Sequence, residues 1–78
     1  MIKLGIYQHY NGNFYQVVGL ARHSESLDEV VVYQSLGGDF GLWVRPLAMF
    51  TENVMIDGKE TPRFRFVDTA LDKAPGVR

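Results

Sequence analysis

Cysteine is absent from this sequence of 78 residues. Disulfide bonds, thiolate metal ligands and cysteine nucleophiles are therefore excluded. Small secreted domains commonly depend on disulfides, so the absence favours a cytoplasmic protein. No apolar run is long enough for a signal peptide or a membrane-spanning helix, and we expect a soluble protein with no membrane partner.

An excess of basic residues is also missing. Eight Lys and Arg residues stand against nine Asp and Glu residues, which gives a formal net charge of −1. Nucleic-acid-binding domains usually carry a clear basic excess, so the composition does not favour that class. A local basic patch is still compatible with these numbers.

Apolar residues, by contrast, are plentiful enough for one packed core. Hydrophobic residues make up 46% of the chain, and its aromatic residues are four Tyr, five Phe and one Trp. This composition argues against disorder, and the length allows a single domain. We place that domain at residues 1–67. The polar segment 68–78 contains a Pro-Gly pair and is expected to form a loose tail.

Two Asx-Gly pairs predict hairpin turns, because Asn, Asp and Gly tolerate positive φ angles. Asn11-Gly12 separates two β-type runs, and Asp57-Gly58 separates two more, with a loop that is expected to extend to Pro62. The run Phe14–His23 is long for one strand, and Gly19 in its middle marks the place where it would bend.

The remaining segments complete an all-β plan. We expect strands at Val30–Leu36 and Leu42–Arg45, loops at Ser24–Glu29 and Gly37–Gly41, and one 3₁₀ turn at Pro46–Phe50. Short strands with frequent turns predict a small SH3-like barrel of five or six antiparallel strands. An OB-fold usually carries a helix between its third and fourth strands, for which Gly37–Gly41 is too short. The expected core residues are Ile6, Val17, Ala21, Val30 or Val31, Val44, Phe50, Val54, Ile56, Phe64 and Phe66.

Several motifs occur together in this chain. They are H-Y-x-G-x-x-Y at His9–Tyr15, A-x-H-S-E at Ala21–Glu25 and W-V-R-P-x-x-M-F at Trp43–Phe50. In this combination the chain resembles, over residues 4 to 67, a small bacterial family of domains of unknown function, family 1653. That family often has Lys where Asn11 stands. The resemblance implies a compact SH3-like β-barrel and implies no assigned activity.

The tripeptide His23-Ser24-Glu25 contains a base, a nucleophile and an acid. A catalytic triad needs these groups to converge, whereas adjacent residues of an extended strand point to opposite faces. We therefore interpret His23 as the end of a strand, and Ser24 or Glu25 as residues that hydrogen-bond the backbone of the following loop. No catalytic residue is predicted.

His9 and His23 are the two histidines of the chain, and they would share a metal only by meeting across a barrel. A stable zinc site needs three or four ligands, which Asp39, Glu25 or Glu29 would have to complete. The spacing of these residues matches no known motif. We predict no metal and no cofactor.

The amphipathic aromatic residues are more informative, because such rings suit half-buried positions on a concave surface. They are Tyr7, Tyr10, Tyr15, Tyr33 and Trp43. SH3-like barrels use such rings to bind proline-rich peptides, modified side chains or bases. Trp43 shares one face of its strand with Arg45, a pair suited to a carboxylate, a phosphate or a stacked ring. The competing interpretation is that these rings, Trp43 above all, fill the core.

Charged residues form two smaller features. Arg63 and Arg65 flank Phe64 and are expected to point outward, where with Lys59 they form either a phosphate-binding strip or a solvated face. Glu25, Asp28 and Glu29 form an acidic loop, which is either solvated or faces a basic partner.

Three hypotheses for function follow. The leading one is a non-catalytic module that binds a peptide or protein partner through the tyrosines, Trp43 and Arg45, with His23 and Glu25 at the rim. The alternative is a nucleic-acid-binding barrel that uses Arg63 and Arg65. The third is a small enzyme or metal protein in which His9, His23, Glu25 and Asp39 converge.

Overall fold

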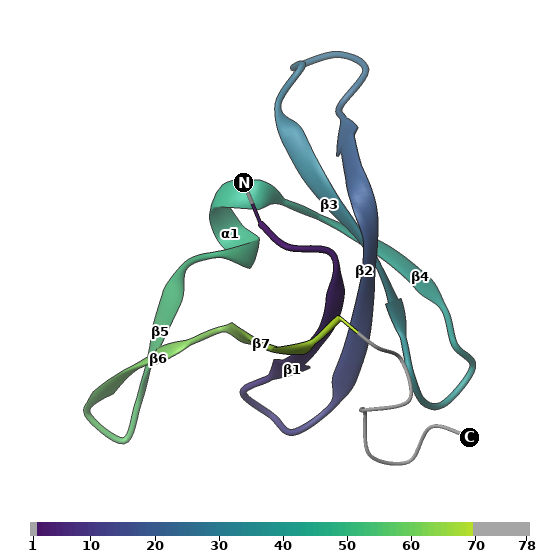
Figure 1. The fold of residues 1–78 in the computed structure, drawn as a ribbon. Helices are drawn as coiled ribbons and strands as arrows, with labels where there is room; N and C mark the ends of the chain where they lie inside the picture. Colours follow the sequence, from purple (N-terminus) through teal and green to yellow (C-terminus); the bar gives the residue numbers. More distant parts are fainter. Residues whose placement is uncertain (1, 70–78) are drawn as a thin grey trace.

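The computed structural model describes residues 2–69, which form a curved antiparallel sheet of five strands and a separate two-stranded hairpin (Figure 1). The five-stranded sheet has the order β4-β3-β2-β1-β7, and β5 pairs with β6. The elements are β1 (Gly5–His9), β2 (Phe14–Arg22), β3 (Glu29–Ser35), β4 (Leu42–Pro46), α1 (Leu47–Phe50), β5 (Asn53–Ile56), β6 (Lys59–Pro62) and β7 (Phe64–Asp68). No helix in this part of the chain is long and apolar enough to cross a membrane.

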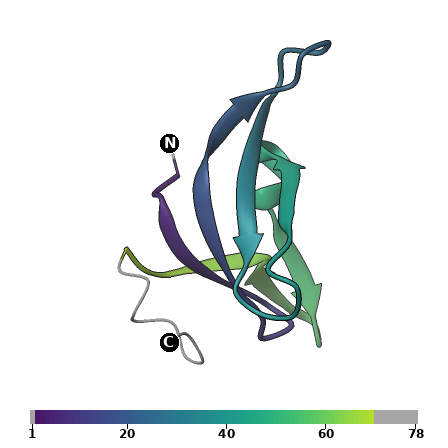
Figure 2. The same ribbon diagram turned by 90° about the vertical axis from the view of Figure 1, so that its right-hand side faces the viewer.

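The all-β class and the antiparallel arrangement are confirmed, but the sheet does not close into a barrel. β4 and β7 are its two edges, and within residues 2–69 neither pairs with a further strand. Helix α1 and the β5–β6 hairpin instead lie to one side of the curved sheet, as the turned view shows (Figure 2). The curvature expected of a small barrel is present without its hydrogen-bonded closure.

The second Asx-Gly turn is tighter than expected. Asp57 and Gly58 have φ angles of 52° and 78°, so they form a two-residue turn with both φ angles positive, as in type I′. Strand β6 therefore starts directly after the turn, and Pro62 ends that strand rather than beginning the next one. The described residues contain seven strands rather than five or six for this reason.

Strand β2 bends where Gly19 predicts it. The register between β2 and β3 shifts between Val17 and Gly19, which is the signature of a β-bulge. The extra residue shifts the alternation of side chains along β2 by one position. Val17, which pairs with Tyr33, and Leu20, which pairs with Val31, therefore lie on the same, core-facing side of the strand. Ala21 is exposed, and its predicted place in the core is wrong because the bulge reverses the faces beyond it.

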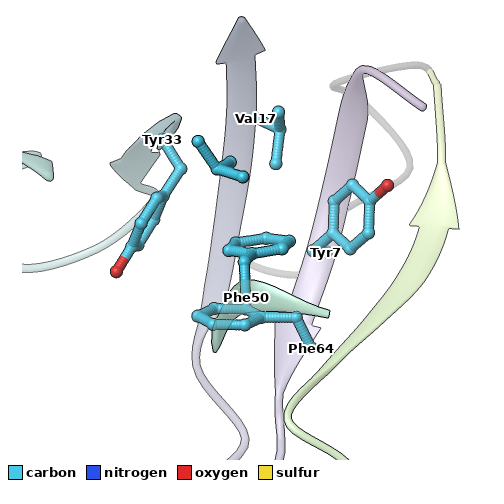
Figure 3. Close-up of a cluster of buried hydrophobic side chains, with 6 residues drawn as sticks. Tyr7, Val17, Tyr33, Phe50 and Phe64 are labelled. Atoms are coloured by element: carbon cyan, nitrogen blue, oxygen red, sulfur yellow. The ribbon is translucent and has the colours of Figure 1, made fainter. Parts of the chain in front are cut away.

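Aromatic rings, together with Val17 and Val31, form the core cluster (Figure 3). Phe50 and Phe64 stack with their centroids 4.0 Å apart and 7° between their planes. Tyr7 and Tyr33 meet Phe50 edge-on at centroid distances of 5.4 and 5.5 Å. Offset-stacked and edge-on pairs add about 0.5–1.5 kcal/mol each to the free energy gained from burial. These contacts connect α1, β1, β3 and β7.

Five of the predicted core residues are buried, and the others are half-buried or exposed. Ile6, Val17, Val31, Phe50 and Phe64 are buried, whereas Val30, Val54, Ile56 and Phe66 are half-buried. Val44 is 64% exposed, because it lies on edge strand β4 opposite Val32, on the side of the sheet that faces away from the ring cluster. Tyr7 and Tyr33, expected among the binding residues, are core residues instead.

Helix α1 is a single α-helical turn rather than the predicted 3₁₀ turn. The backbone N–H of Thr51 donates to the carbonyl of Leu47, four residues earlier, at 3.1 Å. Pro46 precedes the helix with φ −52°, so its fixed ring ends β4 and starts the turn. As predicted, this turn delivers Phe50 into the core, where the side chain is 1% exposed.

Strands β1 and β7 approach each other closely at Gly5. A Cβ atom at this position would lie 2.7 Å from the carbonyl oxygen of Asp68, and the φ angle is +140°, so glycine is required there. Asp68, placed in the predicted tail, still pairs with Ile6 in β7. The rest of that predicted tail, from residue 70 onward, lies outside the described residues.

We expect Phe50→Ala to destabilise the domain by about 3–5 kcal/mol, because it removes one ring of the stacked pair and leaves a cavity. Urea unfolding followed by circular dichroism measures the effect. The matched control is Met49→Ala, which truncates the neighbouring, largely exposed residue of the same turn. Equal losses in the two variants would contradict the central place of Phe50.

Candidate functional site

A groove of about 390 Å³ lies at one end of the sheet. Its walls are the turn between β1 and β2, the loop between β3 and β4, and the strand ends that these segments connect. Asn13, Tyr15, Ser35, Asp39 and Trp43 are among the residues that line it. Because successive hairpins of an antiparallel sheet place alternate turns at the same end, residues distant in the sequence meet here.

Both walls are shaped by local hydrogen bonds from the backbone to side chains. In the β1–β2 turn, the N–H of Asn11 donates to Nδ1 of His9 at 3.1 Å, and the N–H of Asn13 donates to Oδ1 of Asn11 at 2.9 Å. In the β3–β4 loop, the N–H of Gly41 donates to Oδ1 of Asp39 at 3.0 Å. Such side-chain bonds fix loop geometry without regular secondary structure.

Trp43 is a surface residue, so the interpretation that assigns it to the core is wrong. Its side chain is 57% exposed, because β4 is an edge strand and nothing among residues 2–69 covers it. Its indole N–H donates no hydrogen bond within the described residues, and the ring lines the groove. The residue therefore offers an apolar ring face and a free donor at the groove, a combination that is enriched at interfaces.

The predicted single surface of tyrosines does not form. Tyr7 and Tyr33 are buried, and Tyr10 is exposed outside the groove, where its ring lies 4.3 Å from that of His9. Tyr15 is half-buried and lines the groove, and it meets Tyr33 edge-on at 5.4 Å. Of the five predicted rings, the groove therefore brings together Tyr15 and Trp43.

Arg45 shares the core side of β4 with Trp43, as predicted. Arg45 pairs with Val31 of β3 and Trp43 pairs with Tyr33, and both partners point into the core. The Nε–H of Arg45 donates to the Tyr33 hydroxyl at 3.5 Å, which is the outer limit of a hydrogen bond. The guanidinium lies 6.0 Å from the centroid of the Phe64 ring. Arg45 does not line the groove beside Trp43.

The predicted basic strip is only partly present. Arg63 is not turned outward: its side chain is 19% exposed and pairs with Glu52 at 3.0 Å. It stands between β6 and β7, where its backbone N–H also bonds the Glu52 carbonyl and the chain leaves the regular strand alternation. Arg65 is exposed and donates to Oε1 of Gln8. Both arginines are thus engaged within the domain.

His23 and Glu25 lie at the far tip of the β2–β3 hairpin, which projects away from the rest of the sheet (Figure 1). Nδ1 of His23 accepts the N–H groups of Glu25 and Ser26 at 3.1 and 3.3 Å. The tripeptide shapes the loop, as predicted, but the side chain that bonds the loop backbone is His23 rather than Ser24 or Glu25. The hairpin tip places His23 and Glu25 away from the groove.

His9 and His23 do not converge. They lie at opposite ends of β2, separated by roughly 30 Å at about 3.3 Å per residue of extended chain. Within residues 2–69, no three His, Asp or Glu side chains gather in a group that could hold a metal ion. The hypothesis that these histidines share one site is therefore wrong.

His9 sits between the groove wall and the ring cluster, 4.8 Å from Phe64. Partial burial lowers the pKa of His9 from 6.5, and the positive charges of Arg63 and Arg45 lower it further. A hydrogen bond with the Asn11 side chain raises the pKa but does not cancel these effects. Because Nδ1 accepts the Asn11 N–H, the neutral ring with its proton on Nε2 is the form that supports the turn.

We expect the stability of the domain to depend on pH through His9. Its pKa is lower in the folded state, so the unfolded chain binds the proton first. The stabilisation is fully present above pH 6.5 and is lost as the pH falls through the folded-state pKa. Urea unfolding between neutral and mildly acidic pH measures this loss, which His9→Gln should reduce. An unchanged pH dependence in that variant would contradict the assignment.

Comparison with known proteins gives the family of the chain. Residues 5–66 match the family model described as protein of unknown function (DUF1653). The crystal structure of a DUF1653 protein from Bordetella bronchiseptica superposes with a TM-score of 0.81 at 35% identity, over 88% of this chain and 91% of that one. No curated protein matches the chain. The chain therefore belongs to the DUF1653 family, as its sequence motifs indicate.

Proposed function

We propose that this domain is a non-catalytic module that binds a protein partner by seating a proline-rich segment in the groove beside Trp43. The observation that carries the proposal is the exposed Trp43 ring, whose indole N–H has no acceptor among residues 2–69 and which faces the same groove as Tyr15. An aromatic ring and a free donor on one open surface favour a ligand that offers flat apolar faces and backbone carbonyls.

A polyproline II segment has this chemistry. It exposes carbonyl oxygens that are not used in internal hydrogen bonds, and its pyrrolidine rings pack on aromatic side chains. Because the conformation exists before binding, little entropy is lost when the segment docks. Tyr15, supported from behind by Tyr33 and Phe64, provides a fixed second wall for such a ligand.

The polar groups around the groove support binding rather than catalysis. The Ser35 hydroxyl donates to the Gly37 carbonyl at 3.1 Å and accepts the N–H of Gly37 at 3.3 Å. Asp39 is used by Gly41 in a similar way. A nucleophile needs a base within hydrogen-bond reach, and Ser35 is engaged instead in forming the loop. We place this activity in the cytoplasm, where a domain without cysteines needs no oxidising environment.

We expect proline-rich decapeptides, with deca-proline as the simplest probe, to change the fluorescence of Trp43, which is the one tryptophan of the chain. Trp43→Ala should weaken binding at least tenfold in calorimetry, as is typical of a central aromatic anchor. Because the ring is largely exposed, we expect the variant to lose less than about 1 kcal/mol of stability.

The matched control is Tyr10→Ala, which removes an exposed tyrosine outside the groove and should bind like the unaltered domain. The proposal fails if no peptide of this class produces a signal at millimolar concentration. It also fails if the Tyr10 and Trp43 variants lose affinity equally.

A further inference from the structure

Edge strand β4 carries exposed apolar side chains on both of its faces. Leu42 and Val44 are 67% and 64% exposed on one face, and Trp43 lies on the other. Monomeric proteins usually protect such an edge with lysine, a bulge or an inward charge. The other edge, β7, carries the charged residues Arg65 and Asp68, whereas β4 has only Arg45, which turns toward the core.

The backbone of β4 shows which of its polar groups are free. The N–H of Ser35 donates to the carbonyl of Gly41 at 2.9 Å, so these two residues face each other across the β3–β4 ladder. In an antiparallel pair this orientation alternates, and the backbone groups of Trp43 and Arg45 therefore also point toward β3. Those of Leu42 and Val44 point away from the sheet, toward the open edge.

This pattern is complementary to itself. If a second β4 runs antiparallel to the first, Leu42 of each copy can pair with Val44 of the other, which satisfies two donors and two acceptors on each side. The two-fold axis then passes between the Trp43 residues. A register that brings Pro46 opposite Leu42 leaves the Leu42 carbonyl of each copy without a donor, because proline has no N–H. The arrangement with Leu42 opposite Val44 is thus favoured.

The charges agree with the same register. Gly41 then lies opposite Arg45 of the second copy. The space that a side chain at Gly41 would occupy is filled by the Asp39 carboxylate, 3.1 Å from the position of a Cβ atom, and by the Trp43 indole nitrogen at 3.6 Å. Arg45 of one copy therefore faces Asp39 of the other, twice by symmetry. The hydrogen bond that Arg45 makes to Tyr33 is long, so little holds the guanidinium back.

We propose that a second copy of this chain docks on β4, antiparallel and with Leu42 opposite Val44, to form a homodimer with one continuous sheet of ten strands. The groove extends from Trp43 toward β2 and β3, whereas the second copy lies on the outer side of β4 and meets the groove lining only at Asp39 and Trp43. The dimer is therefore compatible with peptide binding and does not depend on it.

The test is Val44→Pro against Val44→Thr, compared by sedimentation equilibrium over a wide range of protein concentration. Proline removes an N–H that points outward, so the β3–β4 ladder stays intact, while two of the four hydrogen bonds between copies are lost. With these two bonds lost, dimerisation should weaken at least about tenfold. Val44→Thr keeps the N–H and the branched shape, and should dimerise like the unaltered chain.

A second measurement addresses the charges. Arg45→Glu places a carboxylate opposite Asp39 of the other copy, twice by symmetry, and should weaken the dimer, whereas Arg65→Glu on the other edge should not. A chain that is monomeric at all concentrations overturns the proposal, as does a folded Val44→Pro variant that dimerises normally. Deca-proline should still change the Trp43 fluorescence of the Val44→Pro variant, so failure of the dimer and failure of the groove give different results.

Discussion

The stack of Phe50 on Phe64 is the contact on which the rest of the structure depends. The five-stranded sheet has two edges within the described residues, and no ladder of hydrogen bonds joins them. The stack connects the turn after one edge strand to the first residue of the other. Tyr7 and Tyr33 close around it from β1 and β3. Packing of these rings therefore stabilises the curvature of the sheet. In a closed barrel the same curvature is held by backbone hydrogen bonds between the edge strands.

The groove depends on the same cluster. Tyr15 lies edge-on against Tyr33 and Phe64, so one wall of the groove is the outer surface of the core. Trp43, across from it, is bound to the domain mainly through the backbone of β4. The site therefore combines a wall fixed by the core with a largely exposed ring, on a strand whose outer edge pairs with no further strand among residues 2–69. Both proposals use this one strand, each from a different side.

Local sequence rules predicted much of the fold. The Asx-Gly turns, the bend at Gly19 and the insertion of Phe50 follow from backbone preferences that act within a few residues. The errors arise where a distant contact decides. Ala21 is exposed because the bulge changes the alternation of side chains beyond it. Val44 is exposed because β4 is an edge strand, and the order of strands in the sheet decides which strand is at the edge. Asn13, Ser35 and Asp39 were missed as groove residues, although an antiparallel order places their two turns at one end.

The position of the single tryptophan has a consequence for spectroscopy. A tryptophan that is buried in the native state shifts its emission to longer wavelength when the chain unfolds. Here the indole is already in contact with water in the native state. Emission from Trp43 therefore reports on the surface of the molecule, and near-ultraviolet signals from the buried Tyr7 and Tyr33 are the better optical record of its interior.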